Sequence, residues 1–249
     1  METRDRQKDG RAEGSIAQEI LPSFRPSCEI ALRGKRAAAF IVIALVTAFS
    51  LIAAAQPKRL LRDPAFLVVA ASAALTQSSH SVYYGFSSLE WRNAGLDGTA
   101  IAALWSVGVV AEIILFIVAA RLPAFLTPSM MLVLGGAGGG LRWLVMAFDP
   151  PVYLLPLLQM LHAFSFGMTY LGALFFTSRH APPGQAATAQ GYLAIVIGLA
   201  MAAAMALSGW LYGLFGAKAY AAMALAAIVG CAYGAVADRA ARRTAGNAL

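Results

Sequence analysis

Two stretches of this sequence decide the fold, and they align with each other without a gap. They read LTQSSHSVYYGF at residues 75–86 and LLQMLHAFSFGM at residues 157–168. Both begin with leucine and carry glutamine, histidine and glycine at the same three later positions. The glutamine and the histidine are three residues apart, so they share one face of a helix. The pattern predicts an internal repeat whose two copies each carry a polar Gln-x-x-His motif.

The composition places these stretches in a membrane protein. Of the 249 residues, 59% are hydrophobic and only 12% are charged, and the mean hydropathy is +0.68. Soluble domains carry about 25% charged and roughly 45–50% apolar residues, so this chain cannot hide its apolar surface in water. The net charge of +7 then indicates basic cytoplasmic loops and no nucleic-acid partner. The two cysteines are far apart and imply no disulfide framework.

Seven apolar segments are long enough to cross a bilayer, which takes roughly 20 residues per helix. Short connections rich in proline and glycine separate them, so no soluble domain of useful size fits between them. The segments are Ala37–Gln56, Pro64–Ser88, Thr99–Arg121, Pro128–Phe148, Val152–Thr177, Ala186–Tyr212 and Ala217–Ala237.

The two repeated stretches belong to the second and fifth of these segments. Because the segments are three spans apart, they cross the membrane in opposite directions. This arrangement predicts an inverted repeat of three helices plus three, related by an approximate two-fold axis in the membrane plane. Chance similarity between apolar helices is the alternative, and the polar Gln-x-x-His in both copies argues against it.

Lysine and arginine asymmetry predicts the orientation. If Pro64–Ser88 starts inside, two basic residues of the short loops, Arg92 and Lys218, are external. The cytoplasmic ones are Lys58, Arg59, Arg62, Arg121, Arg179, Arg239, Arg242 and Arg243. This predicts a multi-pass inner-membrane protein in which residues 239–249 form a basic cytoplasmic tail.

The front of the chain does not fit this rule. Residues 1–36 are polar, carry eight basic residues and six acidic ones, and are expected to be a disordered tail. If residues 37–56 also span the membrane, that basic tail lies outside. A cleaved signal peptide would have a far shorter polar region before its apolar core. Either residues 37–56 do not span in the usual way, or the tail is not the natural neighbour of this helix. We expect a disordered tail followed by an additional N-terminal span.

Few ionisable side chains lie within the segments, and they are the candidate functional residues because such groups are costly in lipid. Glu112 is a candidate proton carrier. Arg142 would hold an anionic substrate or neutralise Glu112. The histidines would relay protons or, with the glutamines, hydrogen-bond a substrate. The substrate-binding candidates are Arg142, His162, Gln159, His80 and Gln77, and the proton-coupling candidates are Glu112 and His162.

Each candidate has a structural alternative. A Glu112–Arg142 pair would serve equally as a bridge between helices, although their depths differ by about 10 Å at 1.5 Å per residue. The histidines and glutamines would serve equally as packing residues. No metal-ligand spacing occurs, and the glycine run at 135–140 lacks the Lys-Ser/Thr of a phosphate-binding loop. No cofactor or metal is expected, and the glycines are expected to allow close helix packing.

Seven short motifs carry a resemblance to a known family. They are RDPAF at 62–66, QSSHSVYYGFSS at 77–88, LWSVGVVAE at 104–112, LRW at 141–143, LQMLHAFSFG at 158–167, ATAQG at 187–191 and LSGWLYG at 207–213. As a set they resemble the C-terminal half of the phenylpropionic acid transporter group of the major facilitator superfamily. That group is related to lactose permease-like and nucleoside–proton symporters.

The resemblance implies proton-coupled uptake of a small aromatic carboxylate by alternating access. The lactose permease-like relatives carry a carboxylate, an arginine and a histidine on three consecutive helices, which Glu112, Arg142 and His162 match. Those relatives have a second carboxylate one turn after the histidine, where this chain has Ser165. The proton path is therefore expected to differ, through Glu112 or His80.

A full transporter of this superfamily has twelve spans. The resemblance makes residues 57–238 helices seven to twelve, and residues 37–56 the sixth. We therefore expect an all-α polytopic protein, half of a major facilitator fold, that needs a missing N-terminal half or a second copy. An inactive remnant or a non-transporting partner subunit is the alternative function. A membrane-embedded enzyme is disfavoured because no cluster of His, Asp and Asn lies at the membrane face.

Overall fold

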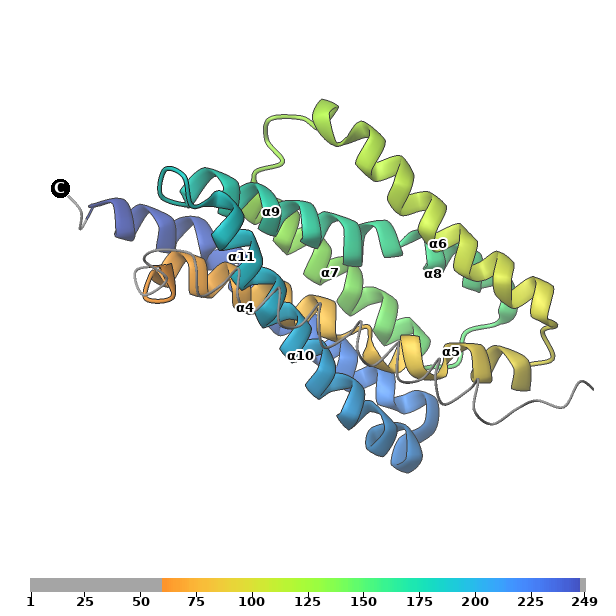
Figure 1. The fold of residues 1–249 in the computed structure, drawn as a ribbon. Coiled ribbons are helices and arrows are strands. Elements are labelled where there is room, and N and C mark those ends of the chain that lie inside the picture. The colour runs from red at the N-terminus through yellow and green to blue at the C-terminus, as the bar shows by residue number, and fades with distance from the viewer. Residues whose placement is uncertain (1–59, 247–249) are drawn as a thin grey trace, which may run out of the picture. The chain divides into compact units, whose positions relative to one another are not determined.

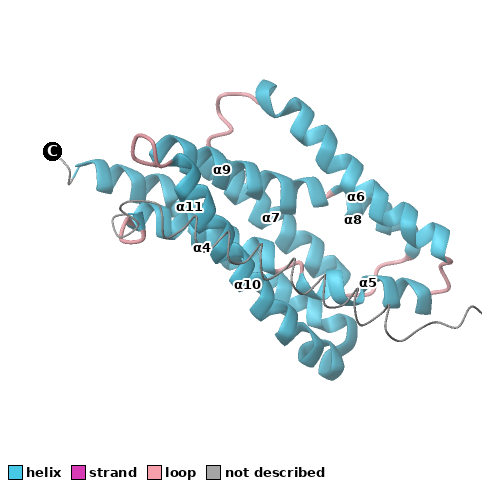
Figure 2. Cartoon of the chain, in the orientation of Figure 1, coloured by secondary structure: helices cyan, strands magenta, loops and turns pink. Residues whose placement is uncertain are grey.

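The computed structural model describes residues 60–246, where every regular element is helical. The expected tail at 1–36 and helix at 37–56 lie outside the described residues. Figures 1 and 2 show the arrangement of the helices. In chain order they are α4 (Pro64–Ser78), α5 (Ser81–Asn93), α6 (Gly98–Val118), η1 (Ala119–Arg121), α7 (Pro128–Met146), η2 (Val152–Leu154), α8 (Leu155–Met160), η3 (Ala163–Met168), α9 (Thr169–His180), α10 (Ala186–Phe215), η4 (Gly216–Ala219) and α11 (Tyr220–Gly246).

Local sequence signals fix where the first helices begin. The carboxylate of Asp63 accepts a hydrogen bond from the Ala65 backbone N–H at 2.9 Å, at the start of α4. Asp97 caps α6 in the same way, through the backbone N–H of Ala100 at 2.8 Å. Thr127 caps α7, whose first residue is a proline. Side-chain oxygens of aspartate and threonine accept from the free N–H groups of a helix start, and a proline at the first position has no N–H that needs a partner.

Four helical stretches are long and apolar enough to cross a membrane. They are Gly98–Arg121, Pro128–Met146, Val152–His180 and Ala186–Ala240. The last stretch holds two of the predicted spans, because the chain turns back at η4 between α10 and α11 (Figure 1). Five of the predicted spans therefore lie in these stretches, and α11 extends the last of them to Gly246.

The prediction of one continuous helix over Pro64–Ser88 is wrong at its centre. The helix α4 ends at Ser78 and α5 begins at Ser81, with a turn at Ser79 and His80. The helix α5 continues along the line of α4 as far as Asn93 (Figure 1). Serines compete for backbone hydrogen bonds and weaken a helix locally. Three serines lie within two residues of this histidine, namely Ser78, Ser79 and Ser81.

The helices pack as an inverted repeat requires. The first unit is α4 to α7 and the second is α8 to α11. The helix α6 packs on α8 and η3 of the other unit, and α10 packs on α4 and α5 in return. Likewise α7 packs on α9 and α11 packs on α4, while α7 and α11 pack on each other. Phe66 near the start of α4 and Phe176 near the end of α9 line one hollow, so these two helices run antiparallel.

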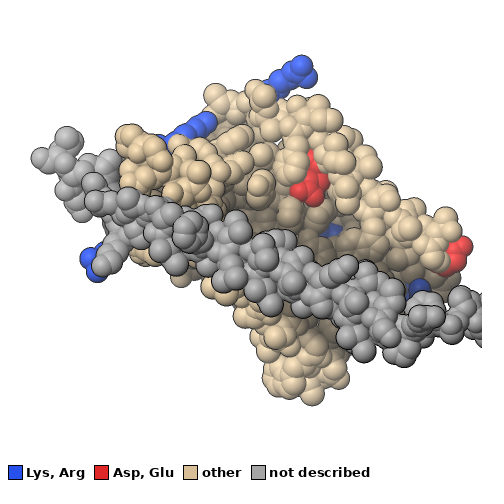
Figure 3. All heavy atoms as spheres, in the orientation of Figure 1, with Lys and Arg blue, Asp and Glu red and all other residues tan. Residues whose placement is uncertain are grey.

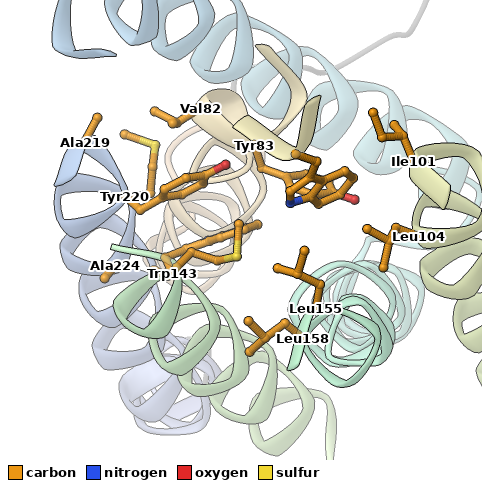
Figure 4. Close-up of a cluster of buried hydrophobic side chains, with 14 residues drawn as sticks. Val82, Tyr83, Ile101, Leu104, Trp143, Leu155, Leu158, Ala219, Tyr220 and Ala224 are labelled. Carbon is orange, nitrogen blue, oxygen red and sulfur yellow. The ribbon is translucent and has the colours of Figure 1, made fainter. Parts of the chain in front are cut away.

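Two larger clusters of buried apolar side chains hold the two repeats together. One joins α5, α6, α7, α8 and α11 around Tyr83, Trp143 and Tyr220 (Figure 4). The other joins α4, α9, α10 and α11 around Phe66, Phe176 and neighbouring aliphatic residues. Outside these clusters, much of α6 exposes large apolar side chains. The space-filling view shows few charged groups on its face of the molecule (Figure 3), as a lipid-facing surface requires.

The glycine run of α7 lets two helices approach closely. A Cβ atom added at Gly136 would lie 2.6 Å from the backbone nitrogen of Cys231 on α11. One added at Gly140 would lie 2.8 Å from the side chain of Ile228. No side chain fits at the first of these positions without moving a backbone. The prediction that residues 135–140 serve close helix packing is confirmed.

Candidate functional site

Arg142 of α7 is the centre of a buried polar cluster and is itself fully buried. Its Nη2 donates a hydrogen bond to Oε1 of Gln159 at 2.8 Å, and its Nη1 lies 3.2 Å from Nδ1 of His162. The guanidinium carbon lies 4.4 Å from the ring centroid of Tyr83 and 4.5 Å from that of Trp143. Two aromatic faces and two polar partners therefore hold the cation in one position.

Gln159 ties α8 to both α5 and α7. Its Oε1 accepts a second hydrogen bond, from the Tyr83 hydroxyl at 2.7 Å. The glutamine is fully buried, so this oxygen is the shared acceptor for two donors on different helices. Loss of either donor would leave the other in place, whereas loss of Gln159 would remove an acceptor from both donors at once.

His162 links Arg142 to the carboxylate of Glu112. Its Nε2 lies 3.4 Å from Glu112 Oε2. A guanidinium can only donate hydrogen bonds, so the Nδ1 that faces Arg142 carries no proton. The ring is therefore the neutral tautomer with its proton on Nε2, directed to Glu112. A direct pair of Glu112 and Arg142 is one prediction from the sequence, but His162 lies between them and contacts both. The imidazole thus spans the difference in depth between the carboxylate and the guanidinium.

His80 occupies the turn between α4 and α5 and is fully buried. Its Nδ1 lies 3.2 Å from the carbonyl oxygen of Thr76 and 3.1 Å from that of Gln77. Carbonyls only accept, so Nδ1 carries the proton. In the neutral ring, Nε2 accepts from the Ser165 hydroxyl at 3.1 Å. Ser165 stands where the related symporters carry a carboxylate, and in this chain it hydrogen-bonds the histidine of the other repeat.

Gln77 completes the set of predicted residues, and it too reaches across to the other repeat. Its Nε2 donates to the backbone carbonyl of Phe166 at 3.3 Å. Three buried polar atoms of this cluster have no hydrogen-bond partner among the described residues. These atoms are Gln77 Oε1, Gln159 Nε2 and Arg142 Nε. Buried polar groups are normally paired, so each is a point at which a water molecule or a solute would be stabilised.

The helix backbone is irregular at both histidines. His80 lies in the break between α4 and α5, and His162 immediately precedes η3, a one-turn π-helix over Ala163–Met168. π-helices are rare, and single π-turns inside α-helices are frequent at functional sites. Interrupted helices at matching positions of two inverted repeats are typical of the binding region of a transporter. The predicted span Val152–Thr177 lies within the helical stretch Val152–His180, which contains this turn.

Glu112 and His162 bring this cluster to the surface. The side chains of Glu112 and His162 are 15% and 10% exposed, whereas Arg142, His80 and Gln159 are fully buried. A proton or solute therefore meets the carboxylate and His162 first. In this conformation Arg142 has no face open to a solute.

The structure brings together all six residues singled out from the sequence, and it adds three that were missed. Tyr83 holds both Gln159 and Arg142, and the indole N–H of Trp143 donates to the Ser79 hydroxyl at 2.8 Å. The signal for Tyr83 was present, because it is the repeat counterpart of Ser165 and both contact the other repeat. Neither Trp143 nor Ser79 carries a sequence pattern that separates it from an ordinary packing residue.

The chain matches a model of known proteins, the "MFS_1 like family", over residues 6–244. It is also similar to the "Probable 3-phenylpropionic acid transporter" of Escherichia coli (strain K12), with 31% identity over 154 residues. That match covers 62% of this chain and 41% of the relative, so the chain spans about two fifths of that relative's length. No solved structure matches the chain significantly. Since the family model covers nearly the whole sequence, the chain belongs to the MFS_1-like family of membrane transporters.

Proposed function

We propose that this chain forms one wall of a secondary transporter that carries a small organic acid together with protons. The observation that carries the proposal is the row of contacts from Glu112 through His162 and Arg142 to Gln159. A charged arginine within the membrane is costly and marks functional sites. Here it is joined to a partly exposed carboxylate by a histidine, whose imidazole can take up a second proton.

The row of contacts supplies a coupling mechanism. Protonation of His162 places a proton on Nδ1, where it faces the N–H of Arg142, and the two groups then repel each other. Nη1 of Arg142 loses its acceptor and becomes available to a carboxylate. The anionic substrate thus gains Arg142 as its partner only when His162 carries the proton. Departure of that proton restores the neutral imidazole. Binding of both ligands before reorientation is what symport requires.

The aromatic side chains near the opening favour an aromatic or apolar acid. Tyr84 and Phe164 are 37% and 44% exposed, and the ring of Tyr84 stacks on Trp105 with centroids 6.1 Å apart. The relative is named for 3-phenylpropionic acid, a carboxylate on a short chain with a phenyl ring. We take this acid as the first substrate to test.

Alternating access needs two walls around a midplane site, and the described helices supply one. We place the second wall in a separate N-terminal half or in a second copy of this chain. In the inner membrane, the start of α4 and the ends of α6, α9 and α11 would face the cytoplasm, because they carry Arg62, Arg121, Arg179 and Arg239. Reporter fusions after Asp149 and at the C-terminus test this orientation, since they should report opposite sides.

Uptake into sealed membrane vesicles tests the transport proposal. Vesicles that contain the full chain should accumulate labelled 3-phenylpropionate when the outside is made acidic. Glu112→Gln should abolish accumulation, while Asp149→Asn, in an exposed loop position with φ 51°, should leave it unchanged. The rival function, a non-transporting partner or remnant, predicts no accumulation from correctly inserted wild-type chain.

A further inference from the structure

A separate hollow lies where α6 ends and α7 begins. Its volume is about 290 Å³, and it shares no lining residue with the polar cluster. Most of its lining is apolar, from η1, the loop before α7, α7 itself and α9, including Leu122, Leu126, Met131 and Phe175. Arg179 in the last turn of α9 is the charged residue in the lining.

The charges at this hollow are all positive. Arg179 is exposed, and Arg121, also exposed, lies between the lining residues Ala120 and Leu122. No Asp or Glu lines the hollow. A ligand that fits these walls has an anionic group beside an apolar body.

The surroundings of the hollow match the edge of a membrane. Phe125, in the loop between the lining residues Ala124 and Leu126, is 71% exposed. Ile117, the second-last residue of α6, is 68% exposed. An exposed phenylalanine near a basic residue suits the boundary between lipid headgroups and acyl chains, and the apolar side of α6 leads from there towards the bilayer interior.

We propose that this hollow binds the headgroup of an anionic phospholipid of the cytoplasmic leaflet. The phosphate would pair with Arg179, and the glycerol and first methylenes would pack on Leu122, Leu126 and Phe175. Small-ligand pockets begin at about 300 Å³, and this hollow has about that volume. It therefore has room for a headgroup but not for a whole lipid. Basic pockets between helices on the cytoplasmic side recognise such lipids. The proposal needs only the membrane location and the orientation above, so it does not depend on transport.

Lipid titration of the purified full chain in detergent tests the site. Thermal unfolding should shift upward with added phosphatidylglycerol, saturably, and not with phosphatidylcholine. Arg179→Gln should weaken the apparent affinity about tenfold, the loss of one charge-assisted hydrogen bond, and Arg179→Lys should retain most of it. Arg239→Gln, an exposed arginine of α11 outside the lining, is the matched control and should behave as wild type.

Three results would overturn the proposal. An equal shift with phosphatidylcholine would show that the headgroup charge is irrelevant. An equal loss in Arg179→Gln and Arg239→Gln would show a general charge effect. A shift of the same size with soluble glycerol 3-phosphate, lost in Arg179→Gln, would identify a free phosphate as the ligand. Native mass spectrometry of the same variants counts the bound lipid and detects binding that does not change the unfolding temperature.

Discussion

His80 and His162 meet ring to ring, with centroids 5.4 Å apart and ring planes at 80°, and they occupy the same position of the two repeats. Residues that lie on a two-fold axis contact their own counterparts. The other cross-repeat contacts, Tyr83 to Gln159 and Ser165 to His80, surround this pair. The polar cluster therefore lies on the approximate axis of the inverted repeat, where both repeats contribute to it.

Arg142→Ala should destabilise the protein strongly. The substitution leaves a fully buried cluster without its cation and removes one donor from Gln159. It also leaves Nδ1 of His162 without its donor, and a buried polar group left without a partner costs about 1–3 kcal/mol. Thermal unfolding in detergent measures the loss, and Leu141→Ala, at an exposed position on the same helix, should shift it far less. Equal stability of the two variants would contradict the central place given to Arg142.

Tyr83→Phe should cost about 0.5–1.5 kcal/mol, the net value of one hydrogen bond. The variant keeps the ring beside Arg142 and removes only the hydroxyl that donates to Gln159. The neighbouring Tyr84→Phe is the matched control, because Tyr84 is 37% exposed and exposed positions usually change stability by less than about 0.5 kcal/mol. If the two variants unfold at the same temperature, the hydroxyl of Tyr83 has no structural role.

His162→Gln should uncouple proton binding and leave the fold intact. A glutamine can still accept from Arg142 and donate to Glu112, but it cannot take up a proton. Uptake by this variant should no longer respond to the pH gradient, although substrate exchange across the vesicle membrane continues. His180→Gln changes a histidine at the end of α9, which packs on Phe176, and should keep the wild-type pH response. A wild-type response in His162→Gln would assign this residue to packing.

Gly136→Ala should destabilise the protein, because its new Cβ would clash with the backbone of α11. Overpacking of this kind costs about 1–3 kcal/mol. Gly209→Ala in α10 is the control, since nothing lies within 4 Å of its Cβ position. There alanine should be neutral or slightly stabilising, as it usually is in an exposed helix. Comparison of the two variants distinguishes the effect of the close approach of α7 and α11 from the general preference of helices for alanine.

The fold and most of the cluster were predictable because the signals are local. Helix length and hydropathy mark the spans, and the Gln-x-x-His repeat predicts which helices are related by inversion. Polar side chains in apolar segments are conspicuous, so Glu112, Arg142 and the two histidines stand out without any structure.

The details that were missed depend on tertiary contacts. The bridge through His162 follows from side-chain directions that residue counting does not give. Counting gives only the difference in depth between Glu112 and Arg142. The break at Ser79 and His80 and the π-turn at Ala163–Met168 change the hydrogen-bond pattern without changing the apolar pattern. Trp143 resembles any core residue in the sequence, and only its position over the guanidinium identifies its role.

The most direct test of the account is whether substrate movement carries protons. In a weakly buffered suspension of vesicles with the full chain, addition of 3-phenylpropionate should make the external medium more alkaline as protons enter with the acid. Glu112→Gln should abolish this change, and Asp149→Asn should preserve it. Substrate accumulation without any alkalinisation, or an undiminished signal in Glu112→Gln, would contradict the proposed coupling through Glu112 and His162.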